Sequence, residues 1–255
     1  MLILLPPSEG KTAPVDGDPV NVAGLAFPEL AGPRRSVLNA LEKVSADPEA
    51  LTMLGVGPSL ADEVKRNISI RSQPVAPANE VYTGVLYEAL SFRTLTGEQQ
   101  AEARSSILVI SALWGAVRFD DDIPAYRLSM SAKLPDLGRL ASYWKRSLGS
   151  VLDERSEGEL LVDCRSSTYA AAWVPPMERT VTVNVFQVRD GKRTVVSHFA
   201  KHTRGEFVRQ LLQRNGKAPE TPHELAEVAA ERWDTELVAP QGTKSYRLNL
   251  VLSSR

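Results

Sequence analysis

Gly10-Lys11-Thr12 follows directly after a short apolar run, residues 2–5, and a turn. A P-loop carries Gly-Lys-Ser/Thr at such a place, and its backbone N–H groups surround the phosphates of a nucleotide. Here Leu5 stands where that motif has its first glycine, and Pro6 and Pro7 remove two backbone donors. The pattern argues against a P-loop. We expect Lys11 and Thr12 to contribute to a different anion site, which Lys11 shares with other cations.

A second chemical signal is the stretch LTMLGVGPSLADEV, residues 51–64. Its apolar positions, its two glycines and the small residue Ala61 follow the helix-hairpin-helix pattern, in which a tight turn joins two short helices. Gly55 and Gly57 suit the positive φ angles of such a turn. The N–H groups of the turn are then expected to face a phosphate without reading a base. We predict a helix-hairpin-helix element over residues 48–68.

The alternative for this stretch is an ordinary pair of helices with a glycine-rich turn, which is a common structure. Lys65 and Arg66 add positive charge beyond the turn, whereas Asp62 and Glu63 weaken the local field. Glycosylases with this motif usually carry a catalytic lysine in the hairpin, but Pro58-Ser59 follows the second glycine here. The stretch therefore favours contact with the DNA backbone over base excision.

Other polar residues lie where predicted strands and helices end, which is where functional sites are usually assembled. They are Tyr82 and Gly84, Gly115 and Arg118, Tyr126 and Arg127, Ser166 and Tyr169, and Lys201 and Arg204. If the cations converge, their mutual repulsion requires an anion or compensating carboxylates between them. The alternative is that each cation pairs with a nearby acid, and Asp120, Asp121 and Asp122 follow Arg118 closely. The tyrosines either stack on bases or join core and surface.

The elements that must position these residues are read from the apolar pattern. Strands are predicted at residues 2–5, 107–111, 160–164 and 246–252, with a hairpin of residues 180–188 and 193–199 around Asp190-Gly191. Helices are predicted from Pro33 to Val44, after Asp47, and over residues 137–152, 200–215 and 222–233. Strands and helices mix without regular alternation. We therefore predict one α+β domain over residues 1–255, with a mixed sheet and surrounding helices, and a doubly wound parallel sheet as the alternative.

Composition narrows the class of protein. The chain has 255 residues, 43% of them apolar, and a net charge of −1, so a broad basic surface is excluded and anion binding must come from local clustering. No signal peptide or apolar run of membrane-spanning length is present, and no membrane partner is expected. Cys164 has no disulfide partner and there are only three histidines, so we expect a cytoplasmic protein without a metal site or cofactor. Cys164 is expected in the core, with a peroxide-sensing thiol as the alternative.

Taken together, these motifs resemble the peroxide stress protein YaaA family. The resemblance rests on the GKT turn, VYTG at residues 81–84, WGAVR at 114–118, YRLSM at 126–130, the Tyr-Trp pair at 143–144, SSTY at 166–169 and AKHTRG at 200–205. It implies a compact fold of the cantaloupe type with a helix-hairpin-helix element and a positively charged cleft. It also implies DNA binding and a role in peroxide resistance, in which members limit intracellular iron.

The resemblance also implies where the cleft residues lie. Lys11, Arg118, Arg127, Lys201 and Arg204 fall on motif positions of the family and are expected along the cleft. Two positions depart from the family pattern, because Ser129 and Thr168 stand where acidic residues are common. Any acid-base or metal chemistry that those carboxylates perform in relatives is therefore in doubt here.

Two functions remain open on the sequence. The first is a DNA-binding protein of the peroxide stress response that contacts the phosphate backbone of duplex or branched DNA. The second is an enzyme that acts on a small anionic or nucleotide-like ligand, with Lys11 or Lys201 as acid, base or nucleophile. A groove continuous with Gly55 and Gly57 favours DNA, whereas a closed pocket centred on Lys11 and Arg127 favours catalysis.

Overall fold

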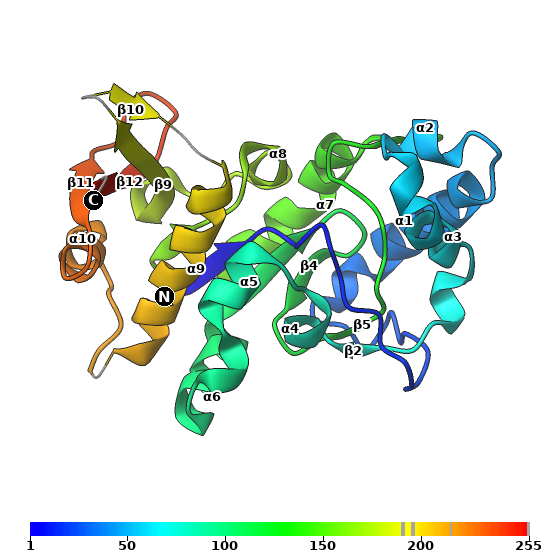
Figure 1. Ribbon diagram of the computed structural model, residues 1–255, viewed down its shortest axis with the longest axis horizontal. Coiled ribbons are helices and arrows are strands. Elements are labelled where there is room, and N and C mark those ends of the chain that lie inside the picture. The colour runs from blue at the N-terminus through cyan, green and yellow to red at the C-terminus, as the bar shows by residue number, and fades with distance from the viewer. Residues whose placement is uncertain (190–191, 195–196, 215, 254–255) are drawn as a thin grey trace.

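The computed structural model describes residues 1–189, 192–194, 197–214 and 216–253. One sheet of eight strands crosses the molecule in the order β11-β12-β9-β8-β1-β3-β4, and β10 pairs with β9 at its edge (Figure 1). The strands are β1 (Leu2–Leu5), β3 (Ile107–Ser111), β4 (Gly115–Arg118), β8 (Leu161–Asp163), β9 (Thr180–Arg189), β10 (Lys192–Thr194), β11 (Asp234–Val238) and β12 (Tyr246–Ser253). Two small antiparallel pairs complete the set, β2 (Ala76–Pro77) with β5 (Asp122–Ile123) and β6 (Lys133–Leu134) with β7 (Gly138–Arg139).

The strand directions confirm the predicted mixed sheet. β1 runs parallel to both β3 and β8, and β9 runs parallel to both β8 and β12. Antiparallel partners, β4 and β11, lie at the two ends. β1 and β8 are buried along their whole length because a central parallel strand is covered on both faces. Strands and helices do not alternate regularly in the sequence, although the central strands of the sheet are parallel, because the connection from β1 to β3 contains several short helices.

Ten helices surround the sheet in the part of the chain that is described. They are α1 (Ala31–Ser45), α2 (Ala50–Leu54), α3 (Ala61–Arg66), α4 (Ala78–Val81), α5 (Val85–Leu90), α6 (Gly97–Ser106), α7 (Leu140–Arg155), α8 (Ser167–Ala170), α9 (Ser197–Gln213) and α10 (Pro222–Ala230). α1, α2 and α3 lie at one end of the molecule, and α10 lies beside β11 at the other (Figure 1). None of these helices has the length and apolar character needed to cross a bilayer.

The predicted elements are largely present at the predicted places. The apolar stripe of α7 is buried at Leu140, Trp144 and Leu148, as its helical spacing predicts. β9 and β10 pair antiparallel with Arg189 opposite Lys192, and the predicted Asp190-Gly191 turn lies outside the described residues. The strand predicted over residues 193–199 is wrong from Ser197 onward, where α9 begins; residues 195–196 lie outside the described residues.

The segment 48–68 forms two short helices joined by a turn and a 3-10 helix at Pro58–Leu60. Gly55 has a φ of 67° and ends α2, as predicted, but Gly57 is extended at φ −78°, which any residue adopts. Ala61 is exposed, so it does not lie between closely packed helices. The geometry is that of a helical hairpin, and its assignment as a DNA-binding helix-hairpin-helix stays a prediction.

A buried arginine ties the loop before α1 to the sheet. The guanidinium of Arg34 is fully buried and donates to the carbonyl oxygens of Ala26, Trp114 and Ala116 at 2.7, 2.9 and 2.7 Å. Burial lowers its pKa to about 10, and Asp121 opposes this shift. These bonds hold the loop that precedes α1 against the ends of β3 and β4, which are next to the residues of the candidate site.

Candidate functional site

A cavity of about 440 Å³ brings together several of the predicted residues. Its walls come from the loop after β1, the turn after α2, and the segment that leads from Arg127 into β6. The lining residues are Ser8, Glu9, Lys11, residues 52–57, Leu60, residues 127–129, residues 131–133 and Tyr169. We call it the Lys11 cavity. Lys11, Gly55, Gly57, Arg127 and Tyr169 were predicted as site residues, and the fold places all five on this one cavity.

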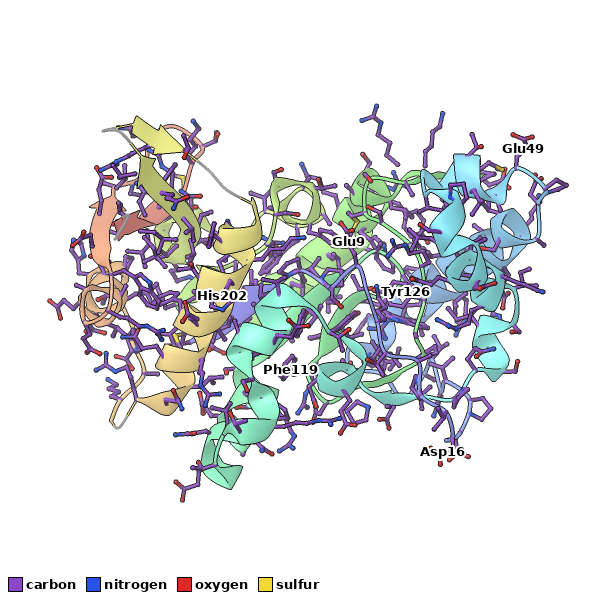
Figure 2. The ribbon with its side chains drawn as sticks, in the orientation of Figure 1. Glu9, Asp16, Glu49, Phe119, Tyr126 and His202 are labelled. Atoms are coloured by element: carbon purple, nitrogen blue, oxygen red, sulfur yellow. The ribbon has the colours of Figure 1, made fainter. Side chains whose placement is uncertain are left out.

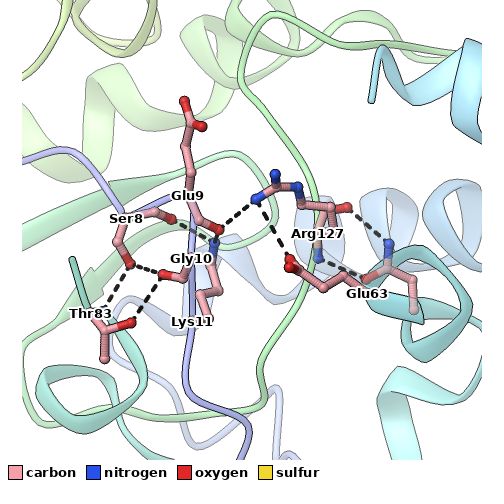
Figure 3. Close-up of polar contacts among 8 residues, drawn as sticks. Ser8, Glu9, Gly10, Lys11, Glu63, Thr83 and Arg127 are labelled. Carbon is pink, nitrogen blue, oxygen red and sulfur yellow. Dashed lines mark hydrogen bonds and ion pairs between the residues drawn. The ribbon is translucent and has the colours of Figure 1, made fainter. Parts of the chain in front are cut away.

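Lys11 is held at its amine by backbone carbonyls and an aromatic face. Its Nζ donates to the carbonyl oxygens of Ser8 at 2.7 Å and Glu9 at 3.3 Å (Figure 3). It also lies 4.2 Å from the centre of the Tyr126 ring. Burial lowers the pKa of Lys11 to about 7, with the positive charge of Arg127 acting in the same direction. Glu63 and Glu9 oppose the shift. Lys11 therefore changes charge near neutral pH.

Arg127 links the cavity to the helical hairpin. Its Nη1 donates to the Glu9 carbonyl at 2.7 Å and lies 3.6 Å from Oε2 of Glu63 on α3 (Figure 3). Its backbone N–H donates to Oδ1 of Asn67 at 2.9 Å, and the Asn67 amide donates back to the Arg127 carbonyl at 2.9 Å. Because Asn67 is buried, this exchange fixes the position of Arg127. The charge of Arg127 is partly compensated by Glu63.

Two of the predicted tyrosines lie beneath Lys11 rather than on the cavity surface. Tyr82 and Tyr126 are almost completely buried, and their hydroxyls hydrogen-bond to each other at 3.0 Å. Tyr126 also hydrogen-bonds to Oγ of Ser111 at 2.7 Å. Burial raises the pKa of Tyr126 well above its ordinary value. These rings support Lys11 from below, whereas Tyr169, half-buried after β8, lines the cavity itself.

The remaining predicted cations do not line the Lys11 cavity. Arg118 pairs with Asp120 at 3.2 Å, which confirms the alternative of a local ion pair. Arg204 donates from Nε to the Val183 carbonyl at 3.0 Å. Lys201 is exposed on α9, and its neighbour His202 lies well away from Tyr126 (Figure 2). The expected convergence of five cations is thus corrected to two, Lys11 and Arg127, since Arg118 on β4 and Lys201 and Arg204 on α9 do not line the cavity.

The other candidate residues lie at the margins of this site. Lys65 is exposed and Arg66 half-buried on α3, and neither lines the cavity. Ser166 is exposed at the start of α8. Thr12 donates its backbone N–H to the Val81 carbonyl at 3.0 Å and lines a neighbouring cavity, together with Tyr82.

Sequence reasoning missed Lys133, Ser131 and Ser8 as lining residues. Ser131 and Lys133 follow the YRLSM motif at residues 126–130 but lie outside it, and only the path of the chain after Arg127 brings them to the cavity. Ser8 stands two residues before Gly10 of the predicted GKT turn, and its proximity was the one available signal.

The amides of the hairpin turn are only partly available to a phosphate. The N–H groups of Gly55 and Val56 donate to carbonyls of α2, in the manner of a helix C-cap. The N–H of Gly57 has no hydrogen-bond partner within the described ranges. The expectation that the turn as a whole presents its amides is therefore corrected, because capping α2 uses two of them.

Cys164 belongs to the core, as the first of its two interpretations predicted. Its side chain is fully buried at the end of β8. Burial raises the pKa of the thiol to about 12, and the positive charge of Arg204 opposes the shift. A peroxide-reactive thiol needs exposure and a lowered pKa, so the sensing interpretation has no support from this geometry.

The described part of the chain is thus a mixed α/β protein in which the loop after β1, the helical hairpin and the segment after Arg127 line one cavity that includes Lys11 and Arg127. Comparison with known sequences identifies the family: the sequence profile described as peroxide stress protein YaaA matches residues 1–236, and the chain belongs to that family. A UPF0246 protein of Streptomyces coelicolor is 43% identical over 99% of this chain and 98% of its own length. A UPF0246 protein of Corynebacterium efficiens is 41% identical, covering 90% and 91%, and an uncharacterised protein of Campylobacter jejuni is 31% identical, covering 80% and 82%. These matches confirm the predicted family.

Proposed function

We propose that this protein binds the sugar-phosphate backbone of DNA through the Lys11 cavity. The observation that carries the proposal is that one cavity joins Lys11, Arg127 and Lys133 to the turn at Gly55–Gly57. Among the described residues, Glu9 is the single acid in the lining of this cavity, and Glu63 compensates part of the charge of Arg127. The lining therefore has a positive balance although the whole chain has a net charge of −1.

The donors of the cavity suit a phosphate better than a base edge. Lys11 and Lys133 act as point charges, and the guanidinium of Arg127 offers its remaining N–H groups. The hydroxyls of Ser129 and Ser131 hydrogen-bond to each other at 2.8 Å, which uses the proton of one of them, so one hydroxyl and the N–H of Gly57 add neutral donors. Contacts of this kind position a backbone without reading sequence, so binding should depend steeply on salt.

Several finer properties belong to the same proposal. We include the assignment of residues 48–68 as a helix-hairpin-helix, the cantaloupe type of the fold, a cytoplasmic location, and a role in limiting iron-dependent damage during peroxide stress. Membership of the peroxide stress protein family supports them. The described residues contain no group of three or more His, Cys, Asp or Glu side chains placed to hold a metal ion, so direct iron binding is not part of the proposal.

Fluorescence anisotropy titrations over a salt series test the proposal, with duplex, bubble and junction DNA. Lys133→Glu reverses an exposed lining charge, and we expect it to weaken binding about tenfold and to reduce the salt slope by about 1. The matched control is Lys217→Glu, an exposed lysine that pairs with Glu220 away from the cavity. Equal affinity of wild type and Lys133→Glu at every salt concentration would exclude the cavity as the DNA site.

A second function, catalysis on a small anionic ligand, is favoured by one observation. Lys11 has a pKa of about 7 and lines a cavity whose volume of about 440 Å³ suits a small molecule. Lys201, the other catalytic candidate, is exposed and does not line it. A screen of nucleotides for turnover, repeated with Lys11→Gln, tests this function. A screen without turnover by the wild type counts against it.

A further inference from the structure

Another, smaller cavity of about 250 Å³ borders α8, as the Lys11 cavity does. Tyr169 of α8 lines the Lys11 cavity, and the next residue, Ala170, lines this one. The floor comes from the face of β9 that carries Thr182 and Asn184, which α9 does not cover. Arg247 on β12 lies opposite Thr182 in the sheet register. We call this the Arg247 cavity.

The half-buried guanidinium of Arg247, which lines this cavity, has no hydrogen-bond partner among the described residues. Nε of Arg247 is shielded from solvent, and no acceptor among the described residues lies within hydrogen-bonding distance of it. A buried polar group of this kind normally has a partner, because leaving it unpaired is costly, and more so when it is charged. A ligand in the cavity does not reach Nε, because Nε has no surface open to solvent; the two Nη groups, which are not buried and have no partner among the described residues, are the donors that Arg247 offers to the cavity.

The acids near this cavity are already paired with other residues. Asp163 receives two bonds from Arg165, Nε to Oδ1 at 2.8 Å and Nη2 to Oδ2 at 2.7 Å. Arg165 also donates to the Trp173 carbonyl at 3.0 Å, so this pair is complete and buried. Asp163 is the only acid in the lining as described. It is therefore not available to Arg247.

Glu236, the acid on the adjacent strand, is also occupied. It accepts bonds from Arg193 at 2.8 Å and from the amide of Asn249 at 3.1 Å. These two bonds hold the pKa of Glu236 below its ordinary value, and Arg247 contributes only as a weaker, more distant charge. Within the described ranges no carboxylate lies within ion-pair distance of Arg247 or of Lys244, the exposed lysine at the cavity mouth.

We propose that the Arg247 cavity binds a small phosphate monoester. Arg247 and Lys244 take the phosphate, because a guanidinium and an ammonium at one mouth match its charge and its several acceptor oxygens. Ser245 and Asn184 also line the cavity. The Ser245 hydroxyl lies 3.2 Å from Oγ1 of Thr182 and the Asn184 amide donates to Oδ1 of Asn249 at 3.0 Å, so each has only part of its hydrogen-bonding capacity left for the polar organic part. The volume limits that part to a few carbon atoms. This binding does not depend on the proposed DNA function.

Isothermal titration calorimetry of the full chain with glycerol 3-phosphate and with inorganic phosphate tests this proposal. Glycerate, which carries a carboxylate in place of the phosphate, is the matched ligand control. We expect millimolar or tighter binding of glycerol 3-phosphate, weaker binding of inorganic phosphate and weaker binding still of glycerate. Arg247→Gln should weaken glycerol 3-phosphate binding about tenfold or more, as expected for the loss of a charge-assisted hydrogen bond.

Three further variants make the outcome decisive. Lys244→Gln removes an exposed charge without risk to the fold and should also weaken binding, which keeps the test valid if Arg247→Gln fails to fold. Arg35→Gln removes an exposed arginine of α1, away from this cavity, and should change nothing. Lys133→Gln probes the Lys11 cavity. No binding by the wild type, unchanged binding by both Arg247→Gln and Lys244→Gln, loss in Lys133→Gln alone, or equal binding of glycerate would each overturn the proposal.

Discussion

Replacing Gly205 by alanine tests how closely α9 and α5 must approach. A Cβ at this position would lie 2.1 Å from the carbonyl oxygen of Leu86 and 2.8 Å from Cβ of Ala89, both on α5. The first contact is with backbone, so no change of side-chain rotamer relieves it. Gly149, inside α7, is the matched control, because its nearest neighbour, Oδ2 of Asp153, is 4.0 Å away.

Both substitutions replace glycine by alanine inside a helix, so the gain in helix propensity is the same for both. They differ in how closely other atoms pack around the new Cβ. Alanine in place of glycine in a helix stabilises by about 1 kcal/mol. At Gly205 the contact at 2.1 Å must open to at least 3.4 Å, which shifts α9 and its buried residues Phe207 and Val208 against the core. Overpacking of this kind costs about 3 kcal/mol. We therefore expect Gly205→Ala to lose about 2 kcal/mol and Gly149→Ala to gain about 1 kcal/mol.

Equilibrium urea denaturation, followed by circular dichroism, measures both variants under the same conditions. For a chain of this size the loss at Gly205 corresponds to a fall in Tm of about 4 to 8 °C. If Gly205→Ala is as stable as the wild type while Gly149→Ala is stabilised, then α9 and α5 do not approach each other as closely as the structure shows.

Three other predictions follow from buried charged and titrating groups. Arg34→Met leaves several buried carbonyl oxygens without their donor and should lower the free energy of unfolding by about 4 kcal/mol in the same denaturation assay; a loss below about 1 kcal/mol would contradict the assigned bonds. Lys11 is protonated below its pKa of about 7 and neutral above it, so DNA affinity at constant ionic strength should fall from pH 6 to pH 8, and Lys11→Met should remove that dependence. Cys164 should resist iodoacetamide and hydrogen peroxide in the folded protein at neutral pH and react fully in urea, as mass spectrometry would show; modification of the native protein would contradict its burial.

Much of the fold was readable from local patterns. β1, β3 and β12 are apolar or alternating runs, and α1 and α7 repeat apolar residues at helical spacing. These signals are local because each depends on the face that one segment buries. The pairing of strands was not readable. β1 lies between β3 and β8, which are far from it in the chain, and the direction of that pairing depends on the helices that connect them.

The sequence by itself determined the family, the cationic character of Lys11 and Arg127, and the glycine that ends α2, since residue type and near-neighbour spacing carry these properties. The tertiary structure alone decided which cations share a cavity. It placed Lys11, Arg127 and Lys133 together and left Arg118 with Asp120. It also lowered the pKa of Lys11 and left Nε of Arg247 without a partner. Burial and convergence depend on contacts between distant segments, and no local pattern of residues encodes those contacts.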